Sequence, residues 1–411
     1  MTNTQVIPSS TEGIRTGTDR VVSIDIFRGL TMAVMIFVNA LSEVRGLPWW
    51  TYHAPAEVDV MTYVDMVFPF FLFAVGLSLP LSVSQRLRRN ASMPALWFHV
   101  AFRSVTLIVL GLILANAEKA DRARMGMSGS AWALLALICA AMFLNVYPKS
   151  ERFQAGFRIL RILGLAGVVV LLALFRRATS DGGSAWLDAS YPEILGLIGY
   201  SYFAVALLYI PTRRWRWAPA VWFVLLVALC ALSTARLVPL PGNLPFYFWP
   251  FDNGAMACII MAGVVTSSIV VRPDRPFEPG RALALAAGFG LMMLAAGRVF
   301  VPLGISKIRA TPTWSLYSIG AAVLLFALLF WVCDVKRKTA WAFFVRPAGS
   351  NTLTTYLLPD LWIFLMGTLG ITYYDTHLSS GWPAVVKTFA FTFLILAVSG
   401  VLTKAKVRLQ L

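Results

Sequence analysis

The sequence predicts an all-α integral membrane protein, a polytopic bundle of about twelve transmembrane helices. Hydrophobic residues make up 58% of the 411 residues and charged residues only 13%, which is more apolar surface than a soluble domain can bury. Apolar runs such as GLTMAVMIFVNAL and AVWFVLLVALCAL extend to the roughly 20 residues that a helix needs to cross the hydrocarbon core. Basic clusters recur between alternate runs, as expected for a chain that crosses a bilayer repeatedly.

The predicted spans follow one another along a single transmembrane domain, residues 21–411. In chain order they cover residues 26–42, 63–83, 97–116, 129–147, 156–175, 191–210, 217–236, 253–271, 281–301, 313–333, 347–368 and 383–402. Residues 1–20 are polar and rich in Ser and Thr, without an apolar region. They are expected to be a disordered cytoplasmic tail.

The distribution of positive charge predicts the orientation of the bundle. Clusters such as those in residues 86–89, 213–216 and 336–338 lie in alternate loops, and the loops between them carry fewer Lys and Arg. Because cytoplasmic loops are enriched in basic residues, both termini are predicted to be cytoplasmic and His53 to face the other side. The formal net charge is +16, but the charges do not gather on one face. The expected partner is therefore the lipid bilayer and not a nucleic acid.

Cysteine and metal chemistry are not indicated by the sequence. The four cysteines fall within or at the ends of apolar spans, so neither an external disulfide nor a loop thiol nucleophile is predicted. The chain has no metal-ligand spacing and no glycine-rich phosphate loop. Any chemistry would depend on histidine, carboxylates and amides, without a metal.

The stretch WWTYHAPAEVD, residues 49–59, places a histidine between two apolar spans. Asp65 opens the second of these spans, twelve residues after His53. If the loop folds back, the Asp65 carboxylate can accept a hydrogen bond from one imidazole nitrogen and leave the other as a base. The alternative is that Asp65 only caps the start of the helix.

Further polar residues occur in the first span. Asp25 and Arg28 are three positions apart and therefore share one helix face. Either they form an ion pair at the helix start, or they line a cytoplasmic mouth where Arg28 meets a phosphate. Asn39 closes the same span, where an asparagine commonly hydrogen-bonds the helix end.

Several motifs together resemble one known family. SIDIFRGLTMAVMIFVN, followed by HA and then DMVFPFFLFAVGLSL, is similar to the opening of the heparan-alpha-glucosaminide N-acetyltransferase family and its bacterial relatives. YPEILGLIGYSYFAVALLY, a Trp-Ser helix after ISKIRATPT, a DV turn and a late Asn-Thr helix are similar to later motifs of that family. The likeness covers nearly the whole chain.

What the resemblance implies is a membrane acyltransferase that moves acetyl from cytoplasmic acetyl-CoA, its co-substrate, to an amino sugar on the far side. The family's active-site histidine corresponds to His53, its loop asparagine to Asn39 and its aspartate to Asp65. The imidazole would either take a proton from the amino-sugar nitrogen or accept the acetyl group itself. The residues leave both routes open.

The remaining predicted site residues fall into two groups. Because CoA phosphates are charged, they should stay at the cytoplasmic mouth. The predicted CoA contacts are Asp25, Arg28, Arg86 and Arg346. The predicted acceptor-site residues are Trp50, Lys307, Trp314 and Asn351. An aromatic residue such as Trp50 at a membrane interface is more often an anchor, and the alternative for Lys307 is a surface charge.

The chain also departs from the family pattern. Two additional apolar segments occupy about residues 129–175, Gly196 and Leu197 stand where the family has QR, and Pro359 and Asp360 stand where it has HE. The loop PGNLPFYFWPFDN is short where the lysosomal members carry a large insertion. The predicted acceptor is therefore a smaller amino sugar or envelope glycan, and not heparan sulfate.

Other functions fit the same composition. An amino-sugar permease could share the fold without acetyl transfer, with its intramembrane polar residues marking a conduction path. An envelope scaffold is a third interpretation. A histidine with a carboxylate partner favours the acetyltransferase over both. The predicted location is a bacterial inner membrane, and a homodimer is left open.

Overall fold

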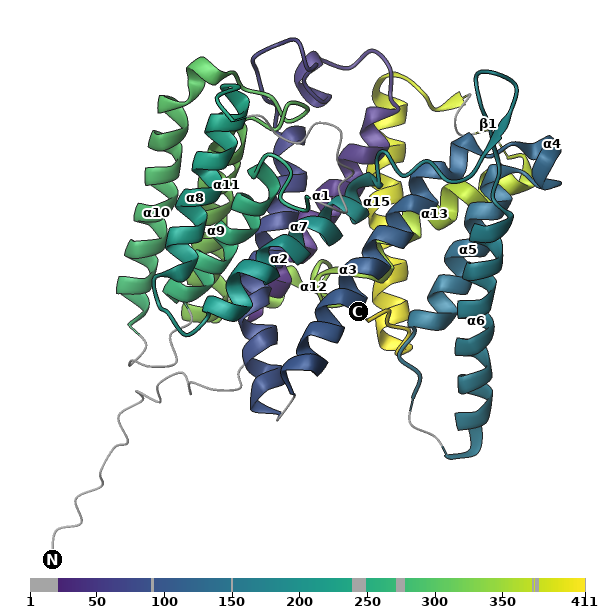
Figure 1. The fold of residues 1–411 in the computed structure, drawn as a ribbon, viewed down its shortest axis with the longest axis horizontal. Helices are drawn as coiled ribbons and strands as arrows, with labels where there is room; N and C mark the ends of the chain where they lie inside the picture. Colours follow the sequence, from purple (N-terminus) through teal and green to yellow (C-terminus); the bar gives the residue numbers. More distant parts are fainter. Residues whose placement is uncertain are drawn as a thin grey trace, which may run out of the picture.

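In the computed structural model, residues 21–89, 92–148, 151–238, 249–270, 278–371, 373 and 377–410 are described. Each of the twelve predicted spans contains a helix in this part of the chain (Figure 1). The long helices are α1 (Val22–Ser42), α2 (Val64–Arg88), α3 (Met93–Asn116), α5 (Gly129–Leu144), α6 (Gln154–Leu174), α7 (Glu193–Thr212), α8 (Ala218–Thr234), α9 (Ala255–Val270), α10 (Pro279–Val299), α11 (Pro312–Phe330), α13 (Thr352–Leu369) and α15 (Gly381–Lys404). The predicted tail, residues 1–20, lies outside the described residues.

Short elements connect these helices. They are the helices α4 (Arg122–Met125) and α12 (Arg346–Ser350), the antiparallel strands β1 (Arg177–Ala178) and β2 (Ser184–Ala185), the 3₁₀ turns Trp49–Thr51, Ala117–Lys119, Glu151–Phe153, Val301–Leu303 and Ala340–Ala342, and a π-helical turn, Trp331–Val335, at the end of α11. The two strands are two residues long each. The prediction of an all-α protein is therefore confirmed.

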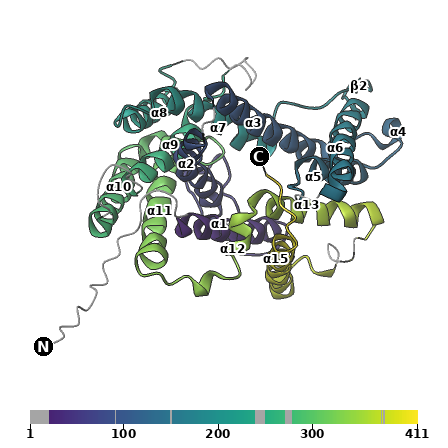
Figure 2. The same cartoon turned by 90° about the horizontal axis from the view of Figure 1, so that it is seen from below.

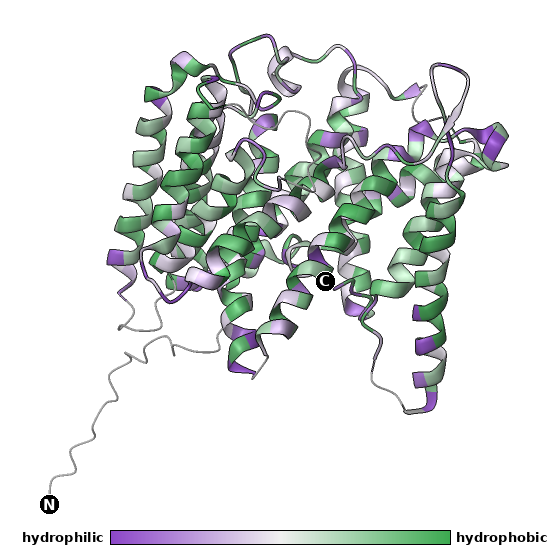
Figure 3. Ribbon diagram, viewed as in Figure 1, coloured by the Kyte–Doolittle hydropathy of each residue, from purple (hydrophilic) through white to green (hydrophobic). Residues whose placement is uncertain are grey.

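The helices have the length and composition of membrane spans. Among the described residues, eight are long and apolar enough to cross a bilayer, and α5, α8 and α9 are shorter apolar helices. Apolar residues form a band around the middle of the molecule, with hydrophilic residues concentrated toward its two ends (Figure 3). The polytopic membrane architecture is thus confirmed, whereas twelve complete crossings and cytoplasmic termini stay predictions.

Alternate loops lie at opposite ends of the bundle. Figure 1 shows residues 43–63, in purple, at the same end as the link between α10 and α11, and far from the end of α2 that carries residues 86–89. This arrangement fits the alternation of basic clusters along the sequence. It also brings two loops that are distant in the sequence to the same end.

The predicted span 347–368 is wrong as a single helix. It is divided into α12 and α13 at Asn351, whose φ of −126° and ψ of 50° are not helical. Gly349, Ser350 and Asn351 are weak helix formers, and the Asn351 amide hydrogen-bonds Val407 O and Thr403 Oγ1 near the C-terminal end of the chain. Figure 2 shows α13 largely side-on, whereas α11 and α15 are seen nearly end-on, so α13 crosses the bundle obliquely.

The start of α1 is held from a distant part of the chain. The Asp334 carboxylate, in the π-helical turn after α11, accepts hydrogen bonds from Val22 N and Ser23 N, both at 3.0 Å. These N–H groups have no partner within their own helix, so a carboxylate there satisfies them and complements the helix dipole. The contact sets the depth at which the first polar residues of α1 lie.

The polar face of α1 is brought against α12 by two glycines. A Cβ atom on Gly29 would clash with the carbonyl oxygen of Val345, and one on Gly349 would clash with that of Asp25. Small residues permit helix backbones to approach this closely. Asp25 is consequently 5% exposed, and its carboxylate lies 3.5 Å from the Arg28 guanidinium, as the ion-pair interpretation predicted.

Candidate active site

The loop between α1 and α2 is folded on itself by its own side chains. The Tyr52 hydroxyl donates to Val44 O at 2.5 Å and accepts from Leu47 N at 3.0 Å. Thr62 Oγ1 donates to the carbonyl of Tyr52 at 2.9 Å. These bonds draw the residue after Tyr52, which is His53, back over the first turn of α2.

His53 and Asp65 form the predicted pair. His53 Nδ1 lies 2.7 Å from Asp65 Oδ1, and the histidine side chain is 40% exposed while the aspartate side chain is 1% exposed. The second carboxylate oxygen accepts from Thr62 N at 3.0 Å and from Ala54 N at 3.2 Å. A buried carboxylate is costly unless its oxygens are satisfied, and here both are.

The helix-cap interpretation of Asp65 is wrong. The N-cap residue of α2 is Tyr63, with no side-chain cap, and Asp65 lies inside the helix. Its carboxylate accepts N–H groups from the preceding loop and not from the first turn of α2. Because Nδ1 donates to this carboxylate, the neutral imidazole carries its lone pair on Nε2.

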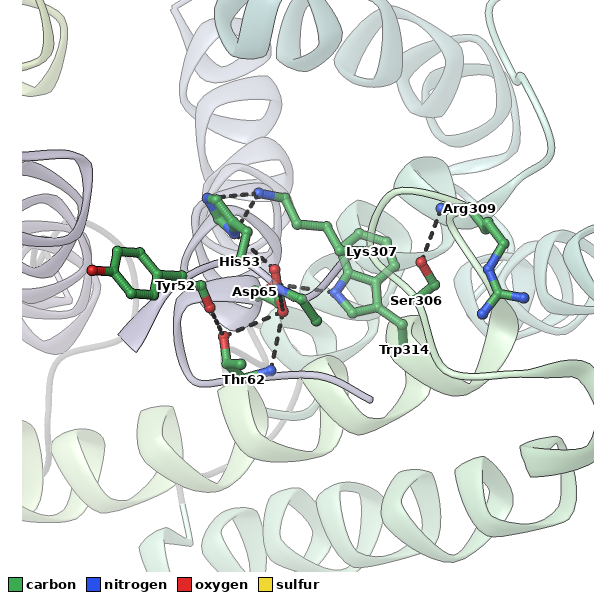
Figure 4. A network of polar contacts seen from close by, with 9 residues as sticks. Tyr52, His53, Thr62, Asp65, Ser306, Lys307, Arg309 and Trp314 are labelled. Carbon is green, nitrogen blue, oxygen red and sulfur yellow. Dashed lines mark hydrogen bonds and ion pairs between the residues drawn. The ribbon is translucent and has the colours of Figure 1, made fainter. Parts of the chain in front are cut away.

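A second loop closes over this pair. Arg309 forms an ion pair with Asp59, which also accepts from Ile305 N at 3.1 Å. The hydrogen bond from Arg309 lowers the pKa of the Asp59 carboxyl. Trp314, at the start of α11, donates from Nε1 to the carbonyl of Asp65 at 3.0 Å. Residues 304–314 are thereby attached to the His53 loop and to the start of α2; Figure 4 shows the bond from Trp314 to Asp65.

This attachment places Lys307 beside the imidazole. Its Nζ lies 3.3 Å from His53 Nδ1 and 3.4 Å from Nε2 (Figure 4). Burial lowers the pKa of the Lys307 ammonium, and the carboxylates of Asp65 and Glu193 oppose this effect. With Nδ1 occupied by Asp65, the lone pair on Nε2 is the acceptor available to Lys307.

Glu193 and Tyr356 extend the cluster inward, and the sequence analysis did not identify them as site residues. Tyr356 Oη donates to Glu193 Oε2 at 3.2 Å, and Leu195 N donates to the same oxygen at 3.3 Å. Glu193 opens α7 with a φ of 56°, a strained value for a non-glycine residue. A carboxylate at the start of the apolar block YPEILGLIG was the signal that could have revealed it.

A cavity lies beside Tyr356, and its lining does not include His53, Asp65, Glu193 or Lys307. It is partly open and lies between α1, α2, α3, α7 and α13. Its polar lining comes from Arg28, Arg103, Thr352 and Tyr356. Arg103 Nε is buried without a hydrogen-bond partner, and its guanidinium lies 4.6 Å from the centre of the Tyr202 ring. Two arginines therefore border a largely apolar cavity, and one of them, Arg28, is paired with Asp25.

The amino-acid sequence was compared with known protein families. Residues 20–250, more than half of the chain, match the family described as Domain of unknown function (DUF5009). The chain belongs to this family. The match includes His53, Asp65 and Glu193 but ends before Lys307.

Two curated proteins are similar over a shorter region. The chain is 38% identical over 97 residues to heparan-alpha-glucosaminide N-acetyltransferase of Homo sapiens, which covers 24% of this chain and 14% of the human protein. It is 35% identical over 102 residues to the Mus musculus protein of the same name, which covers 25% of this chain and 15% of the mouse protein. The resemblance predicted from the motifs is therefore confirmed, although the matched region is a small part of these relatives.

Three predicted residues of this DUF5009 member lie apart from the polar cluster. Asn39 is exposed on α1, and only its backbone carbonyl accepts a hydrogen bond, from Ser42, among the described residues. Arg346 is exposed at the start of α12 and does not line the cavity. The buried Asn351 amide bonds the C-terminal segment and accepts from Thr354 Oγ1 at 2.6 Å, so its hydrogen-bonding groups are used within the fold.

The other predicted residues lie closer to their expected places. Trp314 is 1% exposed, so its indole positions Asp65 and is not available to stack on a sugar. Trp50 is 53% exposed, with its ring 6.2 Å from that of Tyr63. Arg86 is half-buried on α2 and interacts electrostatically with Arg103. The roles of Trp50 and Arg86 in binding stay predictions.

Proposed function

We propose that this protein is a transmembrane acetyltransferase that moves acetyl from cytoplasmic acetyl-CoA to the amino group of an amino sugar or small glycan on the external side of a bacterial inner membrane. The observation that carries the proposal is the His53–Asp65 pair at 2.7 Å, with Lys307 beside its free nitrogen. The similarity to the two N-acetyltransferases supports the same reaction class.

The pair can perform the proton transfer that the reaction needs. An amino-sugar nitrogen is largely protonated near neutral pH and cannot attack a thioester in that form. Imidazole, which ordinarily titrates near about 6.5, is a suitable base. Because Asp65 accepts the proton of Nδ1, the other imidazole nitrogen, Nε2, carries the lone pair and lies beside Lys307. Removal of the proton frees the amine to attack the acetyl carbon, and the C–S bond then breaks to release CoA. Prior transfer of acetyl to the imidazole remains the other route.

We expect the donor to bind at the cavity beside Tyr356. Its arginines, Arg28 and Arg103, would hold CoA phosphates toward the cytoplasmic end. The thin pantetheine arm would then pass Tyr356 and Glu193, and the thioester would reach His53. The nucleotide would stay outside the hydrocarbon, where its charges are less costly. This arrangement lets two substrates on opposite sides meet without either crossing the membrane.

Loss of either cavity arginine is expected to weaken CoA binding. We expect Arg28→Ala and Arg103→Ala to raise the Kd for CoA by roughly 10- to 100-fold, because hydrogen bonds to charged groups contribute about 1.5–3 kcal/mol. Calorimetric titration of the detergent-purified protein measures this change. Arg298→Ala, at an exposed position in the last turn of α10, is the control. Equal CoA affinity in Arg28→Ala, Arg103→Ala and the parent would place the phosphates elsewhere.

Sealed vesicles test the proposed function and its direction together. Vesicles that contain purified protein enclose glucosamine, and acetyl-CoA is added outside; the reverse loading is run in parallel. N-acetylglucosamine should form in the compartment that held glucosamine, because acetyl-CoA does not cross the bilayer. Release of unmodified glucosamine without acetyl-CoA, and no acetylated product, would instead indicate a permease.

A further inference from the structure

The Nζ atom of Lys307 lies where the amine nitrogen of an acceptor would be expected. Its Nζ lies 3.4 Å from His53 Nε2, the nitrogen to which the acceptor amine would give its proton. Reacting atoms in productive complexes lie about 3–3.5 Å apart. Lys307 also carries the same functional group as the proposed acceptor, a primary amine.

The surroundings of Lys307 favour its reactivity. The side chain is half-buried, and burial lowers the pKa of its ammonium. A lysine that can lose its proton is a competent nucleophile. The loop that carries it is held by the Arg309–Asp59 ion pair and by the bond from Trp314 to Asp65. Lys307 is therefore kept beside the imidazole by contacts that do not depend on a bound sugar.

We propose that Lys307 occupies the place of the acceptor amine, and that the protein acetylates Lys307 when acetyl-CoA is bound without an acceptor. The inference rests on the proposed function, because acetyl-CoA is the donor. An arriving amino sugar displaces the lysine and is acetylated in its place. Without an acceptor, the enzyme modifies itself and blocks its own acceptor site.

The reaction balances without any further reagent. The Lys307 ammonium gives one proton to His53 Nε2, and its nitrogen forms a bond with the acetyl carbon of the thioester. The C–S bond breaks, and the departing CoA sulfur takes a second proton from the nitrogen to leave as the thiol. His53 releases its proton to solvent. The product is an amide that carries no charge.

Acetylation has a consequence for the site. The neutral amide is no longer attracted by the carboxylates of Glu193 and Asp65, which favour the ammonium. The added acetyl group also fills the space beside His53 Nε2. Incubation with acetyl-CoA before the sugar is added should therefore inactivate the enzyme progressively.

The test uses full-length purified protein and acetyl-CoA labelled in its acetyl group. Protein is incubated with and without glucosamine, digested, and analysed by mass spectrometry of the peptides that contain lysine. We expect label on Lys307 that is at least tenfold above that on Lys336, an exposed lysine that serves as the internal control. Glucosamine should suppress the label, and His53→Ala should remove it. His53→Gln provides a second variant if the alanine protein does not purify as a single species.

Each outcome has a defined meaning. Label at Lys307 that needs His53 and declines with glucosamine supports the inference. Acetylated glucosamine without label at Lys307 overturns the inference and leaves the proposed function intact. Equal label at Lys307 in the parent and both His53 variants indicates uncatalysed acetylation and overturns it. Absence of both products overturns the proposed function and the inference together.

Discussion

Replacement of His53 by alanine is expected to reduce acetyl transfer to glucosamine by roughly 10²- to 10⁴-fold, the range contributed by a positioned general base. His53 Nε2 lies 3.4 Å from Lys307 Nζ, which marks the proposed place of the amine, and Asp65 Oδ1 holds the imidazole at 2.7 Å from Nδ1. Without the imidazole, the acceptor stays protonated and cannot attack the thioester. Product formation from acetyl-CoA is measured at saturating glucosamine.

A matched control separates chemistry from folding. His377 is an exposed histidine that stacks on Tyr373, with ring centres 4.4 Å apart. His377→Ala should keep most of the activity. Both variants should elute as single species in detergent and bind CoA as the parent does. Unchanged turnover in His53→Ala would refute the mechanism. Acetyl trapped on His53 after rapid quenching would favour the covalent route over direct transfer.

Asp65→Asn is expected to reduce turnover by roughly 10²- to 10⁴-fold as well, by reversing the tautomer of His53. The asparagine oxygen can keep the bonds from Thr62 N and Ala54 N, which turns the amide N–H₂ toward Nδ1. Nδ1 must then accept a hydrogen bond, so Nε2 carries the proton and can no longer act as a base. The expected loss is in kcat, because Asp65 does not line the donor cavity.

The control for this variant is another carboxylate in the same region. Asp59→Asn weakens the bond to Arg309 but leaves the His53–Asp65 pair intact, so it should reduce turnover far less. CoA affinity, measured by the same titration, should be unchanged in Asp65→Asn. A normal kcat in Asp65→Asn would show that the carboxylate supports the loop fold and not the tautomer.

Much of the architecture could be predicted from the sequence, because membrane helices are determined locally. Each must satisfy its own backbone hydrogen bonds and present apolar side chains to lipid, so long apolar runs indicate α1, α2 and α11 directly. The division at Asn351 was not predicted. It depends on bonds to Thr403 and Val407, which no local pattern records.

The contrast between features determined locally and features determined by long-range contacts also applies to the candidate site. His53 and Asp65 could be paired from the sequence because only twelve residues separate them, and a loop of that length readily folds back. Asn39 is nearly as close to His53 in the sequence, yet its side chain is exposed on α1, because helix geometry determines the face on which it lies.

Tertiary structure alone decided which of the other site residues come into contact. Lys307 lies 254 residues from His53, and Glu193 lies 163 residues from Tyr356, yet each pair is in contact. Arg28 and Arg103 share a cavity although they belong to different helices. The apolar pattern of a span predicts its helix but not the helix it packs against, since lipid and protein interiors are nearly equally apolar. Close backbone packing, such as that of Gly29 against α12, and the few long-range polar bonds determine which charged side chains meet.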